Sequence, residues 1–180
     1  MADQLTPVFG EWRIVEQNKN GEVLQDRQLT NLVVDSGKVM LLTALFMLTG
    51  SSGVVSMAVG ASSTSPSVSN TTLVYELTGN GVRKPLTNTS GAALSLSDIV
   101  AETVVISGVT YTQKLVAQAQ WLTGDANNGN TFAEYGLFNS ANCPFTPTSS
   151  SGTMFNRLVD PSPTLKTAAN IITSQVTIRF

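Results

Sequence analysis

The chain has 180 residues, of which 42% are hydrophobic and 12% charged, and it contains one cysteine and no histidine. Histidine is the side chain best suited to proton transfer and metal binding near neutral pH, so its absence argues against an enzyme, a cofactor and a His-based metal site. The net charge of −2 comes with scattered Lys and Arg residues, which provide no basic surface for direct nucleic-acid binding.

The length suits one folded domain, and we expect it over residues 11–180, after an N-terminal arm over residues 1–10. The arm contains a proline and no long apolar run, so it does not read as a secretory signal, and we expect synthesis in a cytoplasm. The unpaired Cys143 agrees with a reducing compartment and is expected to be an apolar filler. The longest apolar run, Val39–Leu48, is half of the ~20 residues that span a bilayer, so no membrane association is expected.

The first part of the chain predicts a hairpin and two further strands. Trp12–Glu16 and Glu22–Leu24 flank Asn18–Gly21, whose Asn and Gly residues favour a tight turn. The segments Gln28–Val34 and Val54–Val59 follow as strand candidates.

One segment, Ser36–Thr49, predicts a helix of about three turns because its apolar residues recur at three- and four-residue steps. These residues are Val39, Leu42, Leu45 and Phe46. Asp35 is expected to cap the first N–H groups, and Gly50 suits the left-handed residue after the last turn. The apolar stripe is expected to pack in the core, the alternative being a groove for a lipid or a partner.

The second part of the chain alternates polar and apolar residues, which is the pattern of half-buried strands. The predicted strands are Thr103–Ile106, Thr110–Trp121, Thr131–Phe138, Thr153–Val159 and Ile172–Phe180, and Ser107-Gly108 supplies a two-residue turn between the first two. These strands are enough for two sheets. We therefore predict a mainly β protein, an antiparallel, jelly-roll-like β-sandwich with one short α-helix near residues 36–49.

The connections Ala61–Thr72, Thr87–Ser97 and Asn142–Gly152 are rich in Ser, Thr, Asn, Gly and Pro and are expected to become ordered against a neighbour. Asp125–Asn130 is faintly similar to a calcium loop, but its Gly is one place early and no Glu closes it, so we expect a tight turn. The carboxylates elsewhere are dispersed and form no acid–base pair in the sequence.

Two charged residues lie inside apolar strand segments. Glu134 is part of Thr131–Phe138, and Arg157 is part of Met154–Val159. Burying either charge is costly unless it is paired. We therefore hypothesise a buried ion pair between Glu134 and Arg157, or pairing across a subunit boundary, the alternative being that both point to solvent.

Four short blocks follow one another along the chain. The first block is Thr30–Gly37, at the entry to the helix, and the second is Met57–Gly60 together with the following Ser62–Pro66 and Asn70–Leu73. The third is Glu134–Phe138 (EYGLF), and the fourth is Gly152–Arg157 (GTMFNR). Lys166 then precedes the last strand. This layout resembles small virion structural proteins of tailed bacteriophages. Asn70 stands where that pattern has Asp, and Ala58 and Ser62 stand where it has Gly.

The resemblance implies a non-enzymatic virion protein that is made in the host cytoplasm and assembles as a homo-oligomer, foremost a homotrimer. We expect a capsid-decorating (cement) protein that binds the major capsid protein; the alternative is a tail, collar, baseplate or fibre-attachment protein. Partner contacts are expected from the arm Met1–Gly10 and from the loops Ala61–Thr72 and Asn142–Gly152.

A carbohydrate-binding module is a further alternative. Trp12, Trp121 and Tyr135 are the residues that could stack on sugars. All three fall within the strand pattern, which favours core packing instead.

Overall fold

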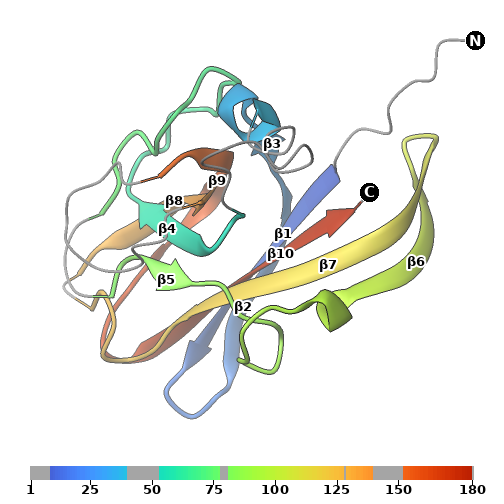
Figure 1. Ribbon diagram of the computed structural model, residues 1–180. Helices are drawn as coiled ribbons and strands as arrows, with labels where there is room; N and C mark the ends of the chain where they lie inside the picture. The colour runs from blue at the N-terminus through green and yellow to red at the C-terminus, as the bar shows by residue number, and fades with distance from the viewer. Residues whose placement is uncertain (1–8, 40–52, 78–80, 128, 140–151, 180) are drawn as a thin grey trace, which may run out of the picture.

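The computed structural model describes residues 9–39, 53–77, 81–127, 129–139 and 152–179, and they form a two-layer antiparallel β-sandwich with a short helix (Figure 1). The first sheet has the strand order β2-β1-β10-β7-β6, and the second has the order β3-β9-β8-β4-β5. The mainly β fold with two antiparallel sheets is therefore confirmed.

The first sheet consists of β1 (Phe9–Asn18), β2 (Val23–Thr30), β6 (Ile99–Ile106), β7 (Val109–Trp121) and β10 (Asn170–Arg179). The second consists of β3 (Leu32–Val33), β4 (Ser56–Gly60), β5 (Lys84–Pro85), β8 (Thr131–Phe138) and β9 (Met154–Leu165), and a 3-10 turn, η1 (Leu96–Asp98), precedes β6. The bounds of β8 agree with the prediction, and β7 and β10 agree within two residues. Phe180 lies outside the described residues.

The predicted strand Gln28–Val34 is wrong as a single element. It divides at Asn31 into β2, which belongs to the first sheet, and β3, which pairs with β9 in the second. The Asn31 side chain lies where a Cβ at Gly10 would be, so the chain turns the corner between the sheets beside that glycine. Apolar alternation continues across the corner and does not reveal where a strand changes sheets.

β9 extends to Leu165, beyond the predicted end at Val159. It contains Pro161 and Pro163, which cannot donate a ladder hydrogen bond. The register of β8 against β9 shifts between Phe132 and Glu134, which leaves room for the two prolines without ladder partners.

The helix begins at Asp35, one residue before the predicted start, and is described as far as residue 39. The Lys38 amide donates to the Val34 carbonyl at 3.1 Å, and the Asp35 carboxylate lies 2.8 Å from Lys38 Nζ. Asp35 is therefore in the first turn, where it still interacts favourably with the helix dipole. Residues 40–52, with the rest of the predicted stripe and Gly50, lie outside the described residues.

The predicted arm Met1–Gly10 overlaps β1, because Phe9 and Gly10 pair with Arg179 and Ile178 of β10. Residues 1–8, Cys143 and all of the loop Asn142–Gly152 except Gly152 lie outside the described residues.

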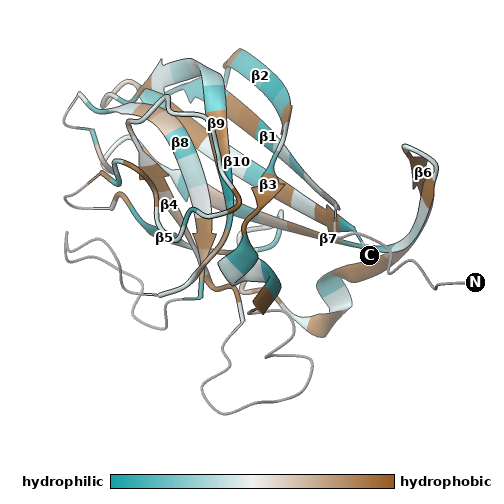
Figure 2. Cartoon of the chain, turned by 90° about the horizontal axis from the view of Figure 1, so that it is seen from above, coloured by the Kyte–Doolittle hydropathy of each residue, from teal (hydrophilic) through white to brown (hydrophobic). Residues whose placement is uncertain are grey.

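The main core lies between the sheets and is built around aromatic residues. Trp12, Trp121, Phe132 and Tyr135 are fully buried, with ring centroids 5.3–6.4 Å apart in tilted or edge-to-face contacts. Trp121 Nε1 donates to the Val82 carbonyl at 3.0 Å, which satisfies its polar group. Figure 2 shows hydrophobic and hydrophilic residues following one another along the strands of the sandwich.

Candidate functional site

Glu134 of β8 and Arg157 of β9 form an ion pair with both side chains fully buried. Arg157 Nε donates to Glu134 Oε2 at 2.8 Å, and Nη2 lies 2.8 Å from the same oxygen. Of the alternatives that the sequence left open, the structure has the pair within one subunit. Neither charge points to solvent.

The remaining N–H groups of Arg157 bind a single loop. Nη2 donates to the Thr64 carbonyl at 2.9 Å, and Nη1 donates to the Ser65 carbonyl at 3.3 Å and to Asn70 Oδ1 at 3.1 Å. A guanidinium has five N–H donors in a planar fork, and these contacts together with those to Glu134 give every donor an acceptor. The Arg157 charge is thus both neutralised and hydrogen-bonded, as a buried charge requires.

Glu134 holds the other end of the same loop. Its Oε1 accepts from the Tyr75 amide at 2.7 Å, and its Oε2 accepts from the Val74 amide at 3.1 Å. The Ala61 amide also donates to the Tyr75 carbonyl at 2.9 Å, which closes the base of the loop. We name residues 61–75 the pinned loop, because one buried ion pair fixes its backbone at both ends.

Two glycines make room for this arrangement. A Cβ on Gly60 would lie 2.5 Å from Glu134 Oε1 and 2.5 Å from the Tyr75 carbonyl oxygen. A Cβ on Gly136, the residue directly opposite Arg157, would lie 2.9 Å from a methyl group of Leu73. Both positions therefore need the absence of a side chain rather than a special backbone angle.

A second, small apolar cluster lies beneath the pinned loop. It contains the buried residues Val34, Ala58, Leu73, Phe138 and Met154. The Asp35 amide donates to the Val68 carbonyl at 2.9 Å, which ties the start of the helix to the loop. The loop is thus joined to the outer side of the second sheet by apolar packing as well as by the ion pair.

A second ion pair lies beside the first and was not predicted from the sequence. Arg83 and Glu76 are 2.8 Å apart and almost completely buried, and the Arg83 guanidinium lies 4.3 Å from the centre of the Phe138 ring. Burial raises the pKa of Glu76, Arg83 opposes that rise, and the nearby Glu134 charge adds to it. Glu76 follows an exposed tyrosine in a loop, so no periodic pattern indicated that it is buried.

The exposed surface of the pinned loop is uncharged. Its exposed residues include Ser63, Thr64, Ser65, Ser67, Ser69, Thr71 and Thr72. Val68, Val74 and Tyr75 are also exposed, by 44%, 51% and 64%. The loop therefore presents hydroxyl groups and a few apolar side chains on a fixed backbone, a chemistry suited to contact with another protein.

Lys166, the lysine that precedes the last strand, is fully buried. Its Nζ donates to the carbonyls of Thr167 at 2.7 Å and Asn170 at 3.0 Å, and burial lowers its pKa. The ammonium group closes the turn between β9 and β10. Its role in the structure is to satisfy these buried carbonyl groups.

The described residues of Asp125–Asn130, which exclude residue 128, form a turn as predicted, and Asp125 is held by protein groups. Its Oδ2 accepts from the Leu122 amide at 2.8 Å and lies 2.7 Å from Lys84 Nζ. No cluster of three or more acidic, histidine or cysteine residues suited to a metal ion occurs among the described residues. In the same part of the chain, no helix is long and apolar enough to cross a membrane.

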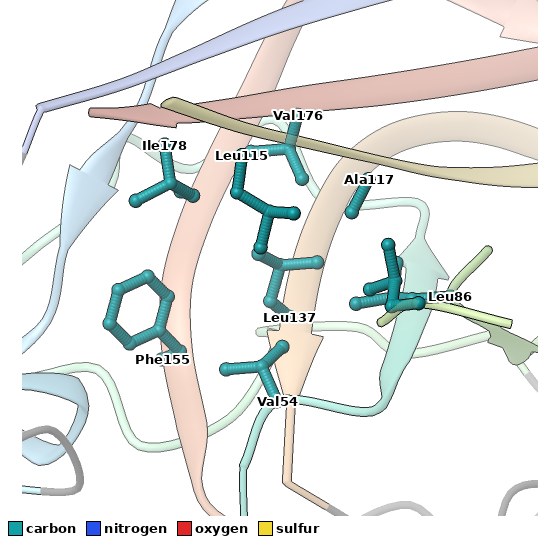
Figure 3. A pocket seen from close by; sticks show the side chains of 9 residues that line it. Val54, Leu86, Leu115, Ala117, Leu137, Phe155, Val176 and Ile178 are labelled. Carbon is teal, nitrogen blue, oxygen red and sulfur yellow. The ribbon is translucent and has the colours of Figure 1, made fainter. Parts of the chain in front are cut away.

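An apolar cavity of about 190 Å³ lies between the sheets (Figure 3). Nine apolar side chains line it, among them Leu86, Ala117, Leu137, Phe155 and Ile178. A cavity of this size and chemistry can hold a small apolar molecule, but its lining offers no hydrogen-bonding side chain to orient a polar cofactor.

Comparisons with models of protein families, with curated proteins and with solved structures gave no match to this chain. The fold defines the chain as an antiparallel β-sandwich. The interpretation of its function rests on the pinned loop and on the residues that hold it.

Proposed function

We propose that the protein is a non-enzymatic structural component of a tailed-phage virion, and that it decorates the capsid by binding the major capsid protein through the pinned loop. The observation that carries this proposal is the Glu134–Arg157 pair, which fixes the backbone of an uncharged Ser/Thr-rich loop at the surface. A loop whose backbone is already ordered loses little conformational entropy when it binds, which favours a permanent structural contact.

The position of the phage-like blocks supports the same proposal. Asn70, Glu134 and Arg157 come from three separate blocks and meet in one hydrogen-bonded cluster, and Asp35 of a fourth block binds the pinned loop. Asn70, which replaces the Asp of the pattern, still accepts a hydrogen bond from Arg157. The blocks therefore share one structural purpose, which is to hold this loop.

The alternative position is in the tail, collar, baseplate or fibre attachment. Copy number separates the two positions. Quantitative mass spectrometry of purified particles should find hundreds of copies per virion for a decorating protein, whereas a few copies per virion would favour the tail and overturn the capsid proposal.

A direct test of the loop uses purified capsids that lack the protein. Val74→Lys places a charge at the exposed loop surface and should abolish binding to the particles, because a desolvated charge without a partner is costly. Val23→Lys is the matched control, since Val23 is 58% exposed on β2, away from the loop. Equal binding by both variants would remove the pinned loop from the proposal.

The three aromatic residues that suggested a carbohydrate-binding function do not lie at the surface. Trp12, Trp121 and Tyr135 are fully buried in the main core and cannot stack on a sugar at the surface. Their role in the structure is to form the aromatic centre of the sandwich.

A further inference from the structure

Three of the four edges of the two sheets formed by the described residues are protected against pairing with another chain. β3 and β5 are two residues long, and β5 consists of Lys84 and Pro85. β2 carries Asp26 and Arg27 in its middle, paired with Arg13 and Asp160. Short strands, proline and charge are the devices by which proteins block unwanted strand addition.

The fourth edge, β6, is long and lacks proline and lysine, and one bulge interrupts its pairing with β7, where Glu102 and Thr103 lie opposite Thr112. It has eight residues, IVAETVVI, and among the described strands it pairs only with β7. Ile99, Val100 and Val105 are 48%, 44% and 63% exposed. The hairpin of β6 and β7 projects beyond the body of the sandwich, and Figure 2 shows the apolar colouring of β6 on that projection.

The single charge of β6 is already neutralised. Glu102 lies 2.6 Å from Lys114 Nζ and 2.7 Å from Arg179 Nε, both of the same subunit. The edge thus offers uncharged β-branched side chains and free backbone groups. A partner strand that is complementary to it must also be uncharged and apolar.

We propose that the β6 edge is an interface between two copies of this chain, in which the β6 strands pair antiparallel about a two-fold axis. An antiparallel edge is self-complementary, because each copy supplies the donors and the acceptors that the other needs. Opposite side chains must lie on the same face of the sheet, and the bulge at Glu102 and Thr103 leaves Ala101 and Val104 on one face and Val100 and Val105 on the other. An axis between Glu102 and Thr103 therefore places Ala101 opposite Val104 and Val100 opposite Val105 of the second copy, and it avoids two facing carboxylates.

The turn at the end of the hairpin identifies a residue for a selective test. Ser107 and Gly108 have φ values of 52° and 80°, which define a two-residue turn with Ile106 and Val109 as the closing pair. The closing pair exchanges the ladder hydrogen bonds, so the N–H of the preceding Val105 points away from β7. Val105→Pro removes that outward donor and leaves the β6–β7 ladder intact.

The test is sedimentation velocity of the full chain over a range of concentrations. The wild type should self-associate, and Val105→Pro and Val105→Lys should each weaken the association by about tenfold or more, the effect of a lost hydrogen bond and apolar pair. Val23→Lys, on the protected edge β2, should leave association unchanged. A monomeric wild type, or equal association by all variants, would overturn the proposal, provided that unchanged melting temperatures show that the variants fold.

Cross-linking provides a second measurement that does not depend on a loss of stability. In a Cys143→Ser background, Thr103→Cys should yield a covalent dimer with a short bis-maleimide, while Val23→Cys should not. Equal yields would contradict the β6 contact. The inference does not depend on the proposed virion role, because the mass in solution and the copy number in particles are measured separately.

Discussion

Arg157 of β9 lies directly opposite Gly136 of β8, and its guanidinium reaches diagonally along the strand pair to Glu134, two residues away. Because Gly136 has no side chain, Leu73 of the pinned loop packs at that position. One strand pair thus supplies the charge partner, the space and the hydrogen-bond donors for the loop. The stability of the sandwich and the shape of the loop are coupled through these residues.

We expect Glu134→Ala to destabilise the protein by about 3–5 kcal/mol, because it leaves the Arg157 charge buried without a counter-ion. Denaturant unfolding measures the loss, and hydrogen exchange should show faster exchange at the amides of Val74 and Tyr75. Asp26→Ala, which breaks the exposed Arg13–Asp26 pair, is the control and should cost no more than about 1 kcal/mol.

The double variant Glu134→Leu with Arg157→Met separates loop fixation from stability. Removing both charges together should recover most of the lost stability, since no charge then remains buried without a partner. Exchange in the pinned loop should stay fast, because the acceptors Thr64, Ser65 and Asn70 have lost their donor. Slow exchange in this double variant would show that the ion pair does not hold the loop.

Gly60→Ala should destabilise the protein by about 1–3 kcal/mol, because the new methyl group would meet the Tyr75 carbonyl and the Glu134 carboxylate at the base of the loop. Gly124→Ala is the matched control: a Cβ there meets no atom within 4 Å, and its effect should stay within about 0.5 kcal/mol. Thermal unfolding of the two variants measures the difference. Equal melting temperatures would mean that the strand and the loop can move apart to accommodate the methyl group without loss of stability.

The sequence predicted the strands better than it predicted their connections. Period-two alternation locates β7, β8 and β10 because each buries one face, and it suggested that Glu134 and Arg157 need partners because they interrupt apolar segments. It could not show the change of sheet at Asn31, since alternation is the same in either sheet. It also could not reveal the Glu76–Arg83 pair or the exposed β6 edge, because burial in these regions depends on which strands become neighbours.

The pH dependence of stability should show opposite signs for Glu102 and Glu76. Hydrogen bonds from Lys114 and then Arg179 lower the pKa of Glu102, so its contribution is present above its unfolded pKa of about 4.3 and is lost as the pH falls through the folded value. The stability difference between the wild type and Glu102→Gln should therefore shrink in acid, from about 1 kcal/mol or less near pH 7.

Burial raises the pKa of Glu76, so its contribution to stability changes with pH in the opposite direction to that of Glu102. The folded state is more stable with Glu76 protonated than with Glu76 ionised. The contribution of Glu76 to folding stability is therefore greatest below its unfolded pKa and is lost as the pH rises through its folded pKa. The stability of the wild type relative to Glu76→Gln should therefore increase as the pH falls. Melting temperatures between pH 3 and 7 for both variants test the pair of predictions, and parallel curves for the two would contradict them.

Two alanines on the same face of β7 should respond in opposite ways to enlargement. Ala117 lines the apolar cavity, whereas Ala119, also buried, does not. Ala117→Val should stabilise the protein by about 1 kcal/mol, because the added methyl groups fill empty space between apolar side chains. Ala119→Val should destabilise it by about 1–3 kcal/mol, since a close-packed site must shift to accept them. Denaturant unfolding compares the variants, and a loss of stability in Ala117→Val would show that the cavity closes in solution.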